Sequence, residues 1–279
     1  MSPLIDVSVR LASPGGLAMG ADDYRDIDGN MDRELAAYLF SGVTAVKSNG
    51  DPPDAAMRHR ATLESGEMLG SELFVNPATS GGAIQHGSSK EAIASDLFAR
   101  LKDSGAFYQP ALAVVQASSD VASGKPELID GSLVQQVAPK GLLERTRQAL
   151  SSAPKGAANP GIAEIAKQNL LGAYKAGAPL VSGSDSGSPL LFHGPAVHRE
   201  LQLWVQAGVP AAAALQAATY NAAKSLGASD RIGAIRKGYD ATLLLVDGNP
   251  LQDISATERI SSVFLKGERV NRGNLFDQK

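Results

Sequence analysis

The sequence predicts an α/β fold: a barrel of the TIM type that is shortened or incomplete and carries a small C-terminal β appendage. Three observations lead to this prediction. Strand-like and helix-like segments alternate from residue 4 to about residue 226, as in parallel strands joined by crossover helices. The segment Leu180–Gly187 is a short apolar run that ends on small residues around Asp185, and an acid at the end of a barrel strand is typical of an active-site mouth. From residue 232 the alternation gives way to short apolar runs separated by turns.

The individual elements follow from local pattern. The predicted strands are apolar or β-branched runs at 4–11, 44–47, 72–76, 107–115 and 180–184. The predicted helices show apolar residues at helical spacing at 32–42, 53–68, 88–102, 133–150, 162–173, 195–207 and 210–226. A sixth strand-like run at 83–86 follows 72–76 too closely for a parallel crossover, which needs about a dozen residues. The sequence therefore predicts six barrel strands rather than eight.

Two structural units are expected, a barrel-like unit over 1–231 and a C-terminal β segment over 232–279. The tail contains the apolar runs Ala241–Val246 and Ser262–Leu265, and the second run is followed by Lys266 and Gly267. Such a pair favours a tight hairpin turn. We expect a small antiparallel sheet here, the remnant of a composite β-sandwich.

Composition excludes several classes of function. The 279 residues carry a net charge of −3 and no cysteine, so nucleic acid is not an expected partner and disulfides or thiolate metal ligands are excluded. The sequence contains no run of about 18 apolar residues, so no membrane span is expected. The N-terminus shows no signal-peptide pattern. We expect a cytoplasmic protein that acts on a small-molecule ligand or substrate.

Residues 183–270 resemble the amidohydrolase superfamily, in particular its imidazolonepropionase-like and prolidase-like members. The matching motifs include Gly183-Ser184-Asp185-Ser186-Gly187, His193-Gly194, Ala207-Gly208-Val209-Pro210 and Lys237-Gly238-Tyr239-Asp240-Ala241. A weaker match extends upstream, with Pro3–Val7 similar to the first barrel strand, 42–46 to the second, Ile84–Gly87 to the sixth and Tyr108–Leu112 to the seventh.

The resemblance implies a metal-dependent hydrolase of amide, peptide-like or cyclic C–N bonds on a (β/α)₈ barrel. In that family a His-x-His pair on strand one and an Asp on strand eight bind a metal, and further His residues and a modified Lys bind a second one. This chain has Ser8-Val9-Arg10 at the His-x-His position, and a guanidinium offers no lone pair to a cation. Only His86 and Asp185 remain of the implied ligands. The two would make a weak, incomplete site. We expect either one divalent metal such as zinc or no metal.

Asp185 is the predicted catalytic residue, and Arg10 is its predicted partner. If strands one and eight are neighbours, the Arg10 guanidinium points to where the metal would have been and can pair with Asp185 bidentately. The alternative for Asp185 is a helix cap. We predict His193, Lys47 and Tyr108 as substrate-binding residues. The alternatives are a solvent-facing loop histidine for His193 and an exposed strand-end lysine for Lys47.

Three functions remain open. The first is a hydrolase with a metal at His86 and Asp185, its activity impaired by the lost ligands. The second is a non-catalytic or engineered scaffold that binds a small ligand or nothing. The third is a metal-independent hydrolase that uses Asp185 with Arg10 or Lys47. Because missing barrel strands leave exposed edges, we also expect a homo-oligomer.

Overall fold

The computed structural model describes residues 1–75, 84–86, 91–124, 129–152 and 160–277. Five strands pair in parallel, namely β1 (Leu4–Val9), β2 (Val43–Ser48), β3 (Glu72–Phe74), β4 (Ile84–His86) and β5 (Phe107–Gln109). Three more form an antiparallel sheet, namely β6 (Leu243–Val246), β7 (Ile260–Leu265) and β8 (Glu268–Arg269).

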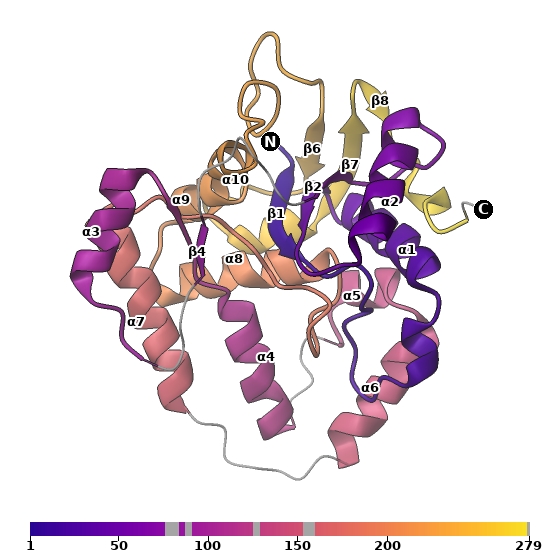
Figure 1. The fold of residues 1–279 in the computed structure, drawn as a ribbon, viewed down its shortest axis with the longest axis horizontal. Helices are drawn as coiled ribbons and strands as arrows, with labels where there is room; N and C mark the ends of the chain where they lie inside the picture. The colour runs from indigo at the N-terminus through magenta and orange to yellow at the C-terminus, as the bar shows by residue number, and fades with distance from the viewer. Residues whose placement is uncertain (76–83, 87–90, 125–128, 153–159, 278–279) are drawn as a thin grey trace.

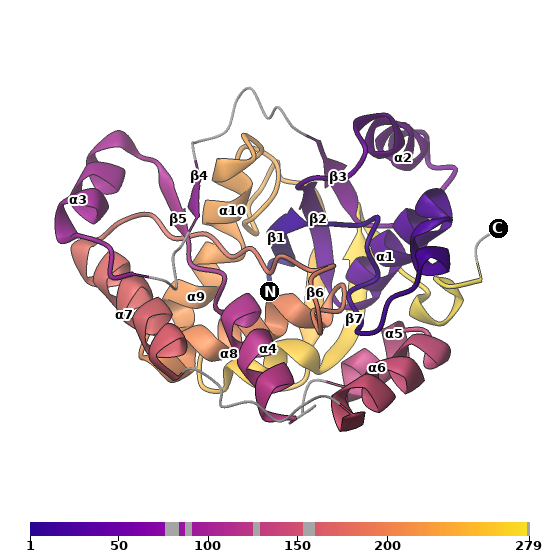
Figure 2. The same ribbon diagram turned by 60° about the horizontal axis from the view of Figure 1, so that its bottom comes forward.

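An extended segment, residues 180–186, joins the two parallel sheets, whose orders are β1-β2-β3 and β4-β5. On one side, the Val181 amide donates to the Tyr108 carbonyl at 3.0 Å. On the other, the Val7 amide donates to the Ser182 carbonyl at 3.2 Å. The segment therefore lies between β1 and β5. Figure 2 shows β4 and β5 on one side of β1 and shows β2 and β3 on the other. The prediction of a regular strand at 180–184 was wrong in one respect, because this ladder is broken into isolated bridges.

Helices surround the parallel strands (Figure 1). They are α1 (Ile27–Phe40), α2 (Pro53–Ser65), α3 (Ser95–Ser104), α4 (Leu112–Ser123), α5 (Ser132–Val137), α6 (Lys140–Ser152), α7 (Pro160–Ala176), α8 (Pro195–Ala207), α9 (Ala211–Ala217) and α10 (Tyr220–Ser225). Short 3₁₀ turns lie at Ala21–Tyr24, Ile254–Glu258 and Arg272–Asn274. α1 packs on β2, α2 on β3 and α3 on β5, which is the arrangement of strands with crossover helices.

Several predicted elements differ from the structure, and one of them is the helix predicted over 210–226, which is divided into α9 and α10. The strand predicted over 107–115 ends at Gln109, because Pro110 has no amide to donate, and α4 begins at Leu112. The helix predicted over 133–150 is divided into α5 and α6 at Pro139. Residues 87–90, where the helix predicted over 88–102 would begin, lie outside the described residues.

The start of α3 at Ser95 has a tertiary cause. The side chain of Asn169 on α7 accepts from the Ile93 amide at 2.8 Å and donates to the Glu91 carbonyl at 3.1 Å. These two bonds take backbone groups at 91–93 that a helix would need for itself. The described part of this predicted helix therefore begins at Ser95.

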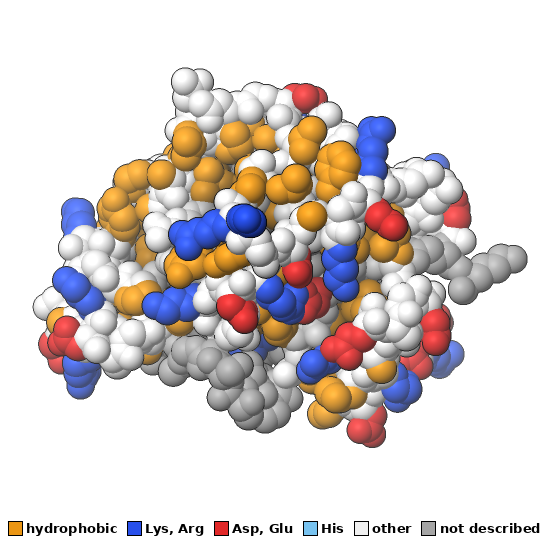
Figure 3. All heavy atoms as spheres, turned by 90° about the horizontal axis from the view of Figure 1, so that it is seen from above, with side chains coloured by type: hydrophobic (Ala, Val, Ile, Leu, Met, Phe, Trp, Pro, Cys, Tyr) orange, Lys and Arg blue, Asp and Glu red, His pale blue; other side chains and the backbone are white. Residues whose placement is uncertain are grey.

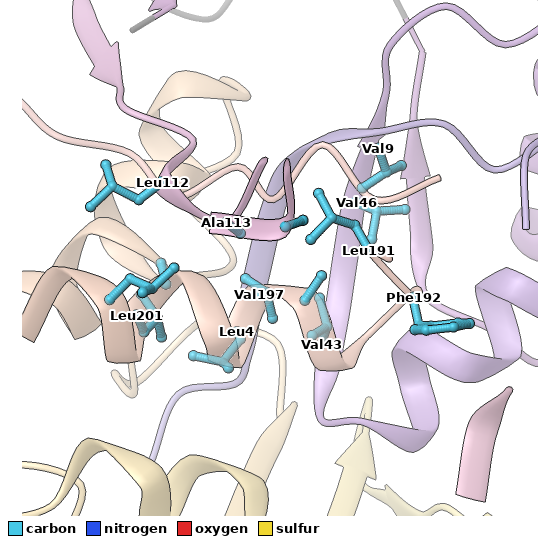
Figure 4. Packing of buried hydrophobic residues seen from close by; sticks show 14 of the residues in the cluster. Leu4, Val9, Val43, Val46, Leu112, Ala113, Leu191, Phe192, Val197 and Leu201 are labelled. Atoms are coloured by element: carbon cyan, nitrogen blue, oxygen red, sulfur yellow. The ribbon is translucent and has the colours of Figure 1, made fainter. Parts of the chain in front are cut away.

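The core lies between the parallel strands and the helices. Figure 4 shows side chains of β1 and β2 meeting those of α4, α8 and the segment before α8. The labelled members are Leu4, Val9, Val43, Val46, Leu112, Ala113, Leu191, Phe192, Val197 and Leu201, and all are buried. This packing fixes β1 and the segments beside it, from which the candidate site is built.

The C-terminal sheet packs its Leu244 and Val263 against Ala36 and Leu39 of α1. The predicted hairpin is present: Lys266 and Gly267 both have positive φ, 51° and 93°, between β7 and β8. A boundary between units at residue 231 stays a prediction. No helix in the described part of the chain is long and apolar enough to cross a membrane.

Candidate functional site

Arg10 and Asp185 form an ion pair at the carboxyl ends of the strands. Arg10 Nη2 lies 2.8 Å from Asp185 Oδ2, with the arginine side chain 48% exposed and the aspartate 18%. The backbone brings them together, because the Asp185 amide donates to the Ser8 carbonyl and the Arg10 amide to the Ser186 carbonyl, each at 2.9 Å. The structure thus contains the predicted pair, although with one hydrogen bond rather than two.

Asp185 adopts an unusual backbone conformation, with φ of 55°. Left-handed conformations are uncommon outside glycine and are found at functional sites and tight turns. The turn is closed by the Ser188 amide, which donates to the Asp185 carbonyl at 3.2 Å. Ser188 Oγ also donates to Asp185 Oδ2 at 3.3 Å. The turn therefore contributes to the orientation of the carboxylate.

The segment that contains Asp185 is similar to a known protein family. Residues 142–270 match the model of the amidohydrolase family, and the match includes Asp185. Over this stretch the chain is therefore similar to amidohydrolases. No curated protein matches the sequence.

Several solved enzyme structures share the fold. A Xaa-Pro dipeptidase with bound methionine superposes with a TM-score of 0.64 at 17% identity, over 96% of this chain and 86% of that one. Molinate hydrolase superposes with a TM-score of 0.62 at 15% identity, over 98% of this chain and 83% of that one. Phenylurea hydrolase B superposes with a TM-score of 0.61 at 14% identity, over 98% of this chain and 85% of that one. At these identities the likeness shows the fold, which is of the TIM-barrel type.

The described residues do not fit the metal centre that amidohydrolases generally use. Ser8 is buried and its hydroxyl accepts from Asn49 Nδ2 at 3.0 Å. Arg10 places a cation on the carboxylate that would bind the metal. Among the described residues no cluster of three or more His, Asp or Glu side chains could hold an ion. His86 ends β4, opposite Gln109 of β5, and its side chain lies outside what the structure describes.

His193 is buried, not exposed in a loop. Its Nε2 donates to the Ser13 carbonyl at 2.7 Å, and its Nδ1 lies 3.3 Å from the Tyr38 hydroxyl. Burial lowers the pKa of His193 to about 4 despite the bond to Ser13, so the ring is neutral at pH 7. Both nitrogens are engaged, so His193 links the loop at Ser13 to helix α1. Substrate binding by His193 stays a prediction.

Lys47 and Tyr108 occupy different environments. Lys47 is half-buried near the end of β2, on the strand face that it shares with Ala45, and burial lowers the pKa of its ammonium. It makes no ion pair with another described residue. Tyr108 is buried in the core, where its ring packs edge-on against Phe98. Lys47 therefore remains available to a ligand, whereas Tyr108 serves packing.

Sequence reasoning missed Asp6, a fully buried carboxyl on β1. Burial raises its pKa to about 6, and the nearby Asp185 charge adds to the rise while hydrogen bonds from Ser184 and Ser8 oppose it. The signal was present in the sequence, because an acid in the middle of the apolar run Leu4–Val9 must be buried with hydrogen-bond partners. Asp6 places a second carboxyl directly behind the ion pair.

Gly187 closes the turn beside the site, and its replacement tests how tightly that turn is packed. Its φ is 91°, and a Cβ there would lie 2.5 Å from the Arg10 carbonyl oxygen. We expect Gly187→Ala to lower the free energy of unfolding by about 2–4 kcal/mol, combining left-handed strain with overpacking. Gly238 has the same φ of 91° with nothing within 4 Å of a Cβ, so Gly238→Ala measures the strain alone. The free energy of unfolding of both variants is measured by urea denaturation. An equal decrease in the two variants would contradict the predicted steric contribution.

A groove of about 600 Å³ lies at the opposite ends of the strands. Its lining includes Thr44 and Ala45 at the start of β2, and Arg231, which bridges Glu72 and Asp240. Figure 3 views the molecule from this side, where hydrophobic side chains gather with Lys and Arg among them. Barrel enzymes use the carboxyl ends of their strands, so we assign the candidate site to Arg10 and Asp185 and not to this groove.

Proposed function

We propose that the chain hydrolyses an amide-type C–N bond of a small molecule at Arg10 and Asp185, without the metal centre of its relatives. The ion pair supports this proposal, since it puts a carboxylate and a cation where the family's chemistry takes place. The Xaa-Pro dipeptidase, molinate hydrolase and phenylurea hydrolase suggest a bond between nitrogen and a carbonyl carbon.

The proposed reaction uses groups that the pair leaves open. Asp185 Oδ2 is held by Arg10 and Ser188, whereas Oδ1 accepts no hydrogen bond from the described residues. Oδ1 takes a proton from water as the water oxygen attacks the carbonyl carbon. The remaining N–H groups of the half-exposed Arg10 stabilise the negative charge that develops on the carbonyl oxygen. The C–N bond then breaks, and Asp185 returns the proton to the departing nitrogen.

The barrel is proposed to be shortened. Only nine residues, 75–83, separate the end of β3 from the start of β4, too few for a helical crossover between parallel strands. Strands four and five of the family's barrel are therefore the ones proposed to be missing. A homo-oligomer formed through the resulting edges stays a prediction from the sequence, as does the cytoplasmic location.

A second candidate is a ligand-binding protein without turnover. It is favoured by the same ion pair, because Arg10 and Ser188 already occupy one oxygen of the Asp185 carboxylate. Lys47, half-buried and without a charged partner among the described residues, would then help to bind an anionic ligand.

A chelator-controlled assay separates these candidates. The purified protein is assayed against dipeptides, anilides, ureas and thiocarbamates, before and after dialysis against a strong chelator. We expect turnover to survive chelation and to fall by about 100-fold or more in Arg10→Ala and in Asp185→Asn. The exposed Arg100, paired with Asp96 on α3, provides the control Arg100→Ala. Turnover that disappears with a removed metal would contradict the metal-free proposal, and calorimetric binding without turnover would establish the second candidate.

A further inference from the structure

Asp6 contacts the backbone on both sides of the site with a single oxygen. Its Oδ1 accepts from the Ser184 amide at 2.9 Å and from the Ser8 amide at 3.2 Å. Ser184 directly precedes Asp185, and Ser8 lies two residues before Arg10. One buried carboxyl oxygen therefore joins the two chain segments that present the two members of the ion pair.

The second oxygen of Asp6 extends this connection to side chains. Oδ2 accepts from the Ser184 hydroxyl, which in turn lies 2.6 Å from the hydroxyl of Ser186. The Tyr38 hydroxyl of α1 lies 3.4 Å from Oδ2 and 3.3 Å from Nδ1 of His193. A buried network thus includes a residue on each side of Asp185 and links the site to α1.

The network also reaches the far side of Arg10. His193 Nε2 donates to the Ser13 carbonyl, and the Ser13 amide donates to the Arg10 carbonyl at 3.1 Å. The Ser13 hydroxyl donates to the Gly187 carbonyl at 2.6 Å. Arg10 and Asp185 are therefore each flanked by residues that the network holds.

These residues need such support because the local backbone supplies little. Arg10 lies just past the end of β1, and Asp185 lies in a broken ladder with a left-handed φ. Neither side chain is positioned by the interior of a regular strand. A carboxylate that accepts amides from two strands can set their register where the ladder does not.

We propose that Asp6 is the positioning residue of the site, holding the turn at Asp185 and the end of β1 so that the carboxylate and the Arg10 guanidinium meet. The catalytic consequence rests on the proposed function, whereas the positioning itself does not. Asp6 acts through the backbone of Ser184 and Ser8 and touches no substrate in this proposal. A purely structural role would leave the Arg10–Asp185 pair unchanged in any variant that still folds.

Nuclear magnetic resonance of the Arg10 guanidinium tests this directly. The ¹⁵N–¹H signals of Arg10 are assigned by their loss in Arg10→Lys, and Asp185→Asn gives the reference for a broken pair. In Asp6→Ala we expect the guanidinium to rotate faster, by about two- to fivefold, toward the value in Asp185→Asn. Asp6→Asn keeps an oxygen for the two amides and should retain most of the wild-type behaviour. Ser184→Ala removes only the hydroxyl contact and should give an intermediate rate.

The control is Glu34→Gln, which removes a buried carboxyl of α1 that makes no hydrogen bond to either strand. Wild-type Arg10 signals in a folded Asp6→Ala protein would overturn the proposal. If that variant does not fold, wild-type signals in Ser184→Ala overturn it instead. Where turnover is measurable, kcat should fall by about 10- to 100-fold in Asp6→Ala with KM little changed. A wild-type protein without turnover would contradict the proposed function while the resonance test still decides the role of Asp6.

Discussion

Replacing Glu200 with alanine is expected to lower the free energy of unfolding by about 3–5 kcal/mol, among the largest effects of any single substitution in this protein. Glu200 lies on α8 and is fully buried. Its Oε1 accepts from the Leu112 amide at 2.9 Å and from the Trp204 indole at 2.7 Å, and its Oε2 accepts from the Ala113 amide at 2.5 Å. Alanine would leave all three donors buried without an acceptor.

The loss should be concentrated in α4. The residue before this helix is Ala111, whose methyl side chain cannot accept a hydrogen bond. Glu200 therefore supplies the acceptor that a capping residue normally provides. Hydrogen exchange should show that the first-turn amides of α4 lose protection in Glu200→Ala before the rest of the protein does.

Two further variants calibrate the Glu200 measurement. Trp204→Phe removes one donor and leaves the cap intact. Its decrease in the free energy of unfolding, measured by chemical denaturation, should therefore be clearly smaller than that of Glu200→Ala. Glu164→Ala, on the exposed face of α7, should change stability by less than about 0.5 kcal/mol. A Glu200→Ala protein as stable as Glu164→Ala would show that α4 does not depend on this carboxylate.

Glu200 also illustrates why part of the fold could not be predicted from local sequence. The run 107–115 has the composition of a strand, and nothing within it specifies a helix after Pro110. The decisive group lies 88 positions away, in Glu200. By contrast, β1, β2 and α2 were predicted closely, because buried β-branched runs and a proline at a helix start are local signals. The division at Pro139 was also local and could have been predicted.

The candidate site divides in the same way. The proximity of Arg10 and Asp185 could be predicted, because neighbouring parallel strands bring their carboxyl ends to one edge. The burial of His193 could not, since it depends on Tyr38 and Ser13, which come from other parts of the chain. The irregular ladder at 180–186 has a similar origin: the Ser184 amide is bonded to the Asp6 side chain instead of a neighbouring strand.

Buried acids also predict an unusual pH dependence, in which stability falls as pH rises above 6.5. Glu34 on α1 is buried with no hydrogen-bond partner among the described residues, and burial raises its pKa from 4.5 to about 8, opposed by the charge of Arg33. The folded state therefore prefers the protonated acid. The stability that protonation provides is complete below pH 4.5 and is lost as pH rises to 8. The difference corresponds to about 5 kcal/mol in total, of which about 2 kcal/mol is lost between pH 6.5 and 8.

Other buried groups determine where this trend can be seen. Asp6 and Glu200, with pKa values raised by burial to about 6 and about 7, act in the same direction as Glu34. His193 and His198 act in the opposite direction, because burial lowers their pKa values to about 4 and the unfolded chain takes up protons first. The histidine contribution is complete above pH 6.5. The window from pH 6.5 to 8.5 is therefore where Glu34 should dominate.

Glu34→Gln isolates this contribution, because every other titrating group is common to both proteins. We expect urea denaturation at half-unit steps from pH 5 to 8.5 to show that the variant becomes more stable relative to the wild type as pH rises. At pH 8.5 its free energy of unfolding should exceed that of the wild type by a few kcal/mol. The exposed Glu144 of α6 provides the matched control, and Glu144→Gln should run parallel to the wild type throughout. Curves for Glu34→Gln and wild type that stay parallel from pH 6.5 to 8.5 would mean that Glu34 is ionised in the folded protein. The packing of α1 around this acid would then have to admit water, because an ionised carboxylate without a partner is not stable in a dry core.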